Sequence, residues 1–76
     1  MDNQEFIEKC KDILEEKGIK REDIFVVWSC KTLQNNKAIM SSFGKGKALY
    51  ELTHNGDKGE IYVDSYEKTS NECIEL

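Results

Sequence analysis

The sequence contains no proline among its 76 residues, and no glycine-rich or serine-rich stretch that would serve as a linker. A chain of this length without a linker is within the size range of one domain. We therefore expect a single domain over residues 1–76. A domain this small buries only about 60% of the surface that its unfolded chain exposes, which leaves little room for a deep enzyme cleft.

Long apolar runs are also missing. No segment approaches the roughly 18 consecutive apolar residues that a membrane-spanning helix needs. The first residues, MDNQEFIEK, are acidic, whereas a secretory signal peptide begins with a basic segment followed by an apolar one. These two absences predict a cytoplasmic protein without membrane association.

Cysteine and histidine are few and widely spaced. The three cysteines, Cys10, Cys30 and Cys73, are an odd number, and neither a CxxC motif nor a Cys/His pair with metal-ligand spacing is present. We expect three free thiols in a reducing compartment, and neither a metal nor another cofactor.

Charge is present in quantity and is unevenly distributed. The formal net charge is −4, with 34% charged residues and 38% hydrophobic residues, a balance typical of a folded domain. Residues 1–23 and 51–76 are acidic, whereas residues 24–50 contain no carboxylate. That middle segment carries the four lysines Lys31, Lys37, Lys45 and Lys47.

Helical periodicity marks the first segment. Asp2 can cap the first turn, with Glu5 three residues later as its reciprocal partner, and Gly18 suits the left-handed position that ends a helix. We therefore predict a helix over residues 3–17. Its apolar face is formed by Phe6, Ile7, Cys10, Ile13 and Leu14.

The remainder alternates as β-structure. Strands are predicted at residues 24–30, 37–43, 48–53 and 60–66, with turns at 34–36 and 55–59. A fifth short edge strand at 73–76 is an alternative. The predicted fold class is α+β, an N-terminal amphipathic helix packed on a four-stranded, or alternatively five-stranded, antiparallel meander sheet.

The first strand is apolar on both faces as far as Val27. This pattern suggests that the helix covers one face and that another element, for example a second subunit, covers part of the other. A monomer and a small homo-oligomer therefore both remain open. Trp28 shares a predicted face with Ile24 and Val26, which favours a core position. The alternative is an interface anchor of the kind that carries binding energy.

A Tyr-Asp-Tyr stripe lies on one face of the last predicted strand. Tyr62 and Tyr66 share this face with Asp64 between them, so the face is amphipathic. The stripe suits a partner-binding surface, although a half-solvated sheet face gives the same pattern. Together with Trp28, these residues are the candidate partner-binding set.

The tetrapeptide GKGK at 44–47 invites a phosphate-binding interpretation, because glycine amides and lysine ammonium groups are what phosphate oxygens need. A P-loop requires GxxxxGK followed by a helix, whereas a strand follows here. The weaker hypothesis is a site for a nucleotide or nucleic acid formed by Lys31, Lys37, Lys45 and Lys47. The alternative is that these lysines complement the acidic helix and last strand of the same molecule.

Cys30, His54 and Asp64 are the residue types of a thiol hydrolase. Cys30 lies in an apolar run, which would raise its pKa and lower its nucleophilicity, and His54 is expected to face solvent beside a turn. We find no convincing catalytic constellation and do not expect an enzyme. The acidic helix suggests another role, imitation of a nucleic-acid backbone toward a basic host protein.

Two stretches resemble a known family. WSCKTLQNNKA (28–38) and LTHNGDKGEIYVDSY (52–66) are similar to the signature segments of an uncharacterised family of small proteins encoded by phages and prophages of Gram-positive bacteria. The resemblance covers about residues 24–68, and the segment 41–48 departs from the family pattern. It implies a setting, the cytoplasm of an infected bacterium, where accessory proteins bind and disable host proteins. The favoured hypothesis is thus a non-catalytic binding module that engages a host protein, with host defence as one target.

Overall fold

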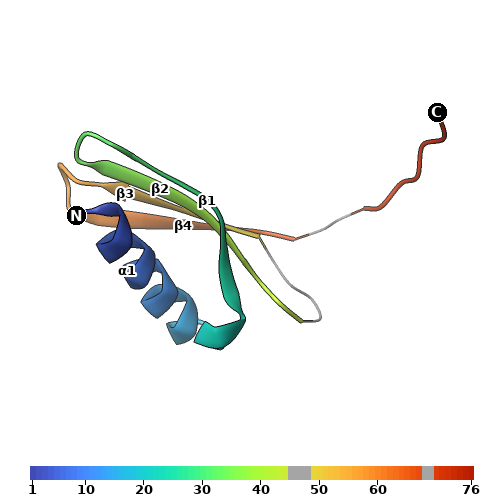
Figure 1. Cartoon of the computed structure of the whole chain (residues 1–76), viewed down its shortest axis with the longest axis horizontal. Helices are drawn as coiled ribbons and strands as arrows, with labels where there is room; N and C mark the ends of the chain where they lie inside the picture. Colours follow the sequence, from blue (N-terminus) through green and yellow to red (C-terminus); the bar gives the residue numbers. More distant parts are fainter. Residues whose placement is uncertain (45–48, 68–69) are drawn as a thin grey trace.

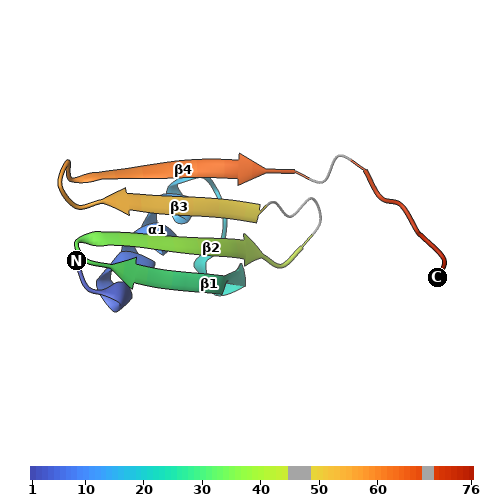
Figure 2. The same ribbon diagram turned by 90° about the horizontal axis from the view of Figure 1, so that it is seen from above.

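The structure, a computed structural model, describes residues 1–44, 49–67 and 70–76. It confirms the predicted α+β fold: one N-terminal helix packs on a four-stranded antiparallel meander sheet of order β1-β2-β3-β4 (Figure 2). Residues 70–76 are exposed and form no strand, so the fifth strand considered at 73–76 does not form. The elements are α1 (Asn3–Glu16), the 3-10 turn η1 (Arg21–Asp23), β1 (Ile24–Thr32), β2 (Asn35–Ser42), β3 (Leu49–Asn55) and β4 (Glu60–Tyr66).

Asp2 and Gly18 cap the two ends of α1, as the sequence predicts. The side chain of Asp2 accepts a hydrogen bond from the backbone N–H of Glu5 at 2.8 Å, and this bond lowers the pKa of Asp2. At the other end Gly18 has a φ of 96°, and the N–H of Ile19 donates to the carbonyl of Leu14 at 3.2 Å. This is the Schellman arrangement, and it explains why the helix ends one residue before the predicted position.

The core lies between α1 and one face of the sheet (Figure 1). Residues four apart on the helix face the strands, because that spacing repeats on one helix face. Alternate strand residues meet them from the other side. The buried apolar residues are Phe6, Cys10 and Leu14 from α1, and Ile24, Ala38, Met40 and Leu52 from the sheet. Burial raises the pKa of the Cys10 thiol to about 12.

A β-bulge divides β1 into two parts. Val26 pairs with Met40 and Trp28 pairs with Ile39, so Val27 has no partner on β2. One extra residue reverses the alternation, and Trp28 therefore leaves the face that Ile24 and Val26 share. The predicted core position of Trp28 is wrong: 49% of it is exposed, on the side of the sheet away from α1. The bulge also bends the strand, and Figure 1 shows β1 curving toward the end of α1.

The two hairpin turns contact each other at one end of the sheet. Gln34 Nε2 donates to Asp57 Oδ1 at 2.7 Å, and the N–H of Gly56 donates to Asn35 Oδ1 at 3.0 Å. A Cβ atom at Gly56 would lie 2.1 Å from the carbonyl oxygen of Gln34, so only glycine fits. The first turn is tighter than predicted, with Leu33 at a φ of 55° and β2 already beginning at Asn35.

Candidate functional site

The side of the sheet turned away from α1 is hereafter the open face. Directly opposed residues in an antiparallel sheet share a face, so the strand register fixes its composition. One row, Trp28, Ile39, Glu51 and Asp64, crosses all four strands. Tyr62 and Tyr66 flank Asp64 along β4. The four candidate partner-binding residues therefore lie on one face.

These four residues share the face but do not meet at a point. Neighbouring strands are about 4.8 Å apart, so Trp28 on β1 and Asp64 on β4 are separated by roughly 14 Å. Ile39 and Glu51 fill the interval, and sequence analysis overlooked both. The alternation of β2 and β3 could have identified them, once their pairing partners were known. The open face is a broad surface rather than a cleft.

Aromatic side chains gather on this face. Trp28, Tyr62 and Tyr66 are 49%, 50% and 51% exposed. Phe25 pairs with Ser41 and so belongs to the open face, and its ring lies 4.8 Å from that of Phe43. Of the seven aromatic residues, all of them described, only Phe6 of α1 and Tyr50 of β3 belong to the core between the helix and the sheet or pack against it.

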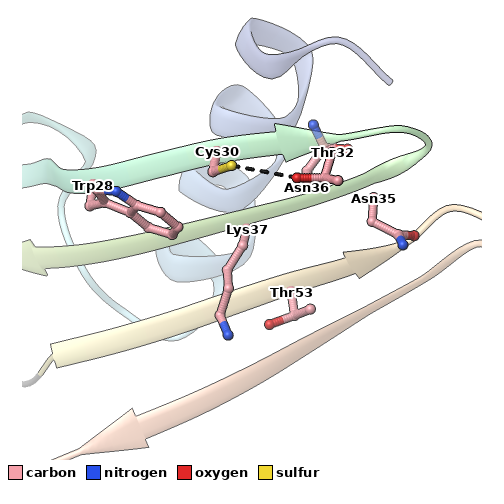
Figure 3. Close-up of a pocket in the computed structure, with 7 residues that line it drawn as sticks. All are labelled: Trp28, Cys30, Thr32, Asn35, Asn36, Lys37 and Thr53. Atoms are coloured by element: carbon pink, nitrogen blue, oxygen red, sulfur yellow. Dashed lines mark hydrogen bonds between the residues drawn. The ribbon is translucent and has the colours of Figure 1, made fainter.

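A shallow groove of about 240 Å³ runs along the β1 side of this face. Figure 3 shows it with α1 behind the sheet. This volume is below the roughly 300–1,000 Å³ of pockets for whole small molecules, and it suits one inserted side chain. The Lys37 ammonium at its border pairs with the Glu51 carboxylate at 3.5 Å. The lining residues are Trp28, Cys30, Thr32, Asn35, Asn36, Lys37 and Thr53.

On the β4 side the polar groups differ in their partners. The Tyr62 hydroxyl donates to the Glu60 carboxylate, and this bond together with the charge of Glu60 raises the pKa of Tyr62. Tyr62 therefore stays a neutral hydrogen-bonded ring. The Asp64 side chain is exposed, and its carboxylate has neither a hydrogen bond nor an ion pair in the described part of the chain.

The lysines proposed for anion binding do not converge where the structure describes them. Lys31 lies on the α1 side of β1, and its Nζ donates to the carbonyl of Met1 at 2.9 Å. Lys37 lies on the open face beside Glu51. Lys45 and Lys47, with the GKGK loop, are outside the described residues.

The residues of the hypothetical thiol site lie on opposite faces. Cys30 and Asp64 are on the open face, whereas His54 points toward α1 and is 8% exposed. The predicted solvent-facing position of His54 is wrong because β3 continues to Asn55. His54 Nδ1 lies 2.9 Å from Asn36 Oδ1. Cys30 is exposed, so the expected apolar surroundings of its thiol are also wrong.

The acidic side of α1 is bound to a residue that follows the helix. Arg21 forms ion pairs with Glu8, Asp12 and Glu15, the pair with Asp12 at 2.8 Å. These carboxylates raise the pKa of Arg21 further above its ordinary value. The spacing of the three acids along one helix side was a signal that sequence analysis overlooked. This cluster lowers the negative charge that the helix offers to a basic partner.

Two structural features that would suggest other activities were not found. Within residues 1–44, 49–67 and 70–76, no three His, Cys, Asp or Glu side chains are grouped so that they could hold a metal ion. In the same residues, no helix combines the length and apolar character needed to cross a membrane.

Comparison with known proteins identifies a family. Neither the curated proteins nor the solved structures gave a match. The family of unknown function DUF6275 matches residues 3–76, which is nearly the whole chain and includes α1 and all four strands. The chain therefore belongs to the DUF6275 family.

Proposed function

We propose that this protein is a non-catalytic binding module that engages a protein partner through its open face. The observation that carries the proposal is the set of half-exposed aromatic residues, Trp28, Tyr62 and Tyr66, on the sheet face that α1 leaves uncovered. Tryptophan and tyrosine are enriched among the residues that dominate binding energy at protein interfaces. Several large aromatic side chains exposed on one sheet face form the kind of surface that marks a protein interaction site.

The partner in this proposal is a host protein in the cytoplasm of a bacterium. The similarity of residues 28–38 and 52–66 to small phage and prophage proteins supports this setting. Binding would act by occupying a surface of the host protein, with a defence factor as one target. No chemical step is needed, and the separation of His54 from Cys30 and Asp64 agrees with that.

Electrostatics favour a protein over a nucleic acid on this face. In the described strands, the open face carries one ammonium group, Lys37, and three carboxylates, Glu51, Glu60 and Asp64. Stacked bases could use the aromatic rings, but a phosphate backbone needs positive charge beside them. The anion-binding hypothesis remains a prediction for the loop at 44–47.

The test is recovery of partners on a tagged protein from bacterial lysate, quantified by mass spectrometry. Three baits are compared: wild type, the double variant Trp28→Ser/Tyr66→Ser, and the control Glu16→Gln on the exposed side of α1. We expect wild type and Glu16→Gln to recover the same protein, and the double variant to lose it. Equal recovery by all three baits, or nothing above background with wild type, would contradict the proposal.

A further inference from the structure

The open face holds a pair of like charges on neighbouring strands. Glu51 and Asp64 are directly opposite each other on β3 and β4. Side chains in such a pair have Cβ atoms about 5 Å apart, and like charges there destabilise a sheet. Lys37 forms an ion pair with Glu51, at 3.5 Å, and the Asp64 carboxylate has no partner among the described residues. Within the described residues the Asp64 carboxylate therefore lacks a cation, and an external cation would satisfy it.

Two aromatic rings border this carboxylate. Tyr62 and Tyr66 are two residues before and after Asp64 on the same face, about 7 Å away along the strand in each direction. Both are half-exposed. An exposed cation above a tyrosine ring is attracted by its negative face. In the described part of the chain, the surroundings of Asp64 thus combine an unpaired carboxylate with flat aromatic surfaces.

This combination distinguishes between the two basic side chains of proteins. A guanidinium group is planar, can bond a carboxylate through two N–H groups and can stack on an aromatic ring at the same time. A lysine ammonium is a strongly hydrated point charge and gains less from the flat surface. The geometry of the Tyr62–Asp64–Tyr66 stripe therefore suits arginine.

We infer that the partner presents an arginine side chain, which binds Asp64, beside Glu51 on the neighbouring strand, and stacks on Tyr62 or Tyr66. This inference rests on the proposed function and adds the chemistry of the partner. The partner surface is basic, to complement the three carboxylates of the open face, and carries an apolar side chain for the groove beside Trp28. A second copy of the chain fits less well, because it would bring the same excess of carboxylates.

The experiment selects peptides from a random displayed library on immobilised wild-type protein. The affinity of the selected peptides is then measured for wild type, Asp64→Asn, Trp28→Ser and the helix control Glu16→Gln. We expect enrichment of arginine. The affinity should fall about tenfold or more with Asp64→Asn, and equally when citrulline replaces the arginine of the peptide. Glu16→Gln should bind as wild type does. Asp64→Asn should melt no lower than wild type, because the like-charge pair is removed.

The remaining outcomes contradict the inference in distinguishable ways. Peptides that need Trp28 but neither arginine nor Asp64 would overturn the arginine site and leave the proposed function standing. Peptides that depend on neither Trp28 nor Asp64 would overturn both. Binding of a single-stranded oligonucleotide at low salt that requires Trp28 would replace the protein partner by nucleic acid. Sedimentation as a dimer that Trp28→Ser dissociates would show that a second copy occupies the face.

Discussion

The reactivity of the cysteines tests which side chains the helix covers. Cys10 is fully buried in the core between α1 and the sheet, whereas Cys30 is exposed on the open face. A thiol-specific reagent such as a maleimide reacts with the thiolate and needs access to it. We expect Cys30 to react rapidly with a maleimide at pH 8 in native buffer, and Cys10 to be protected.

The degree of protection follows from two features of the structure. The pKa of Cys10 is raised by burial to about 12, which lowers its thiolate fraction at pH 8 by about 10³ relative to an ordinary thiol. Reaction through unfolding is also rare. A domain of this size has a free energy of unfolding of about 4–11 kcal/mol, so at most about one molecule in 10³ is unfolded at any time. By either route Cys10 should react at least about 10³-fold more slowly than Cys30.

The assay follows labelling by mass spectrometry of intact protein, with Cys73→Ser to remove the third thiol. In denaturant Cys10 and Cys30 should react at similar rates, which is the internal control. Labelling of Cys10 within about tenfold of Cys30 in native buffer would refute the position of α1. Protection of Cys30 equal to that of Cys10 would show that the open face is covered.

Two further predictions concern stability. Gly56→Ala should lower the free energy of unfolding by about 1–3 kcal/mol in urea titrations, because the added Cβ would lie 2.1 Å from the Gln34 carbonyl oxygen. Lys58→Ala in the same turn is the control. Equal stability of the two variants would contradict this packing. Burial raises the pKa of the Cys10 thiol to about 12 in the folded protein, whereas its pKa in the unfolded chain is near 9. Below pH 9 the thiol is protonated in both states, and the stability that the buried thiol contributes is complete. As the pH rises from 9 toward 12 that stability is lost, because the unfolded chain gives up this proton more readily. Wild type should therefore lose stability faster than Cys10→Ala above pH 9, and parallel pH profiles of the two proteins would argue against burial of this thiol.

Local signals in the sequence were sufficient for most of the fold. Asp2 and Gly18 predicted both ends of α1 because caps depend on single residues at fixed positions. The strand at 60–66 was predicted with its observed bounds because the turn at 55–59 is strongly marked. The first hairpin turn was predicted at 34–36, too late in the sequence, because leucine rarely adopts the positive φ that Leu33 has. Nothing in the neighbouring residues indicates that conformation.

The candidate site was less predictable, because it depends on pairing between strands. The bulge at Val27 has no sequence signature, and it alone moved Trp28 from the predicted core to the open face. His54 was assigned to solvent because the end of its strand was placed too early. The opposition of Glu51 and Asp64 is set by register, which a single sequence does not reveal. By contrast, the Tyr62, Asp64, Tyr66 alternation was visible because it lies within one strand.

The central claim is that the bulge turns the only tryptophan of the chain onto an uncovered sheet face. Quenching of tryptophan fluorescence by acrylamide tests it directly, since the whole signal comes from Trp28. In native buffer the quenching should be at least about half as efficient as in denaturant, because Trp28 is 49% exposed in the folded protein. A native protein whose fluorescence resists acrylamide would place Trp28 in a core or an interface and contradict the account.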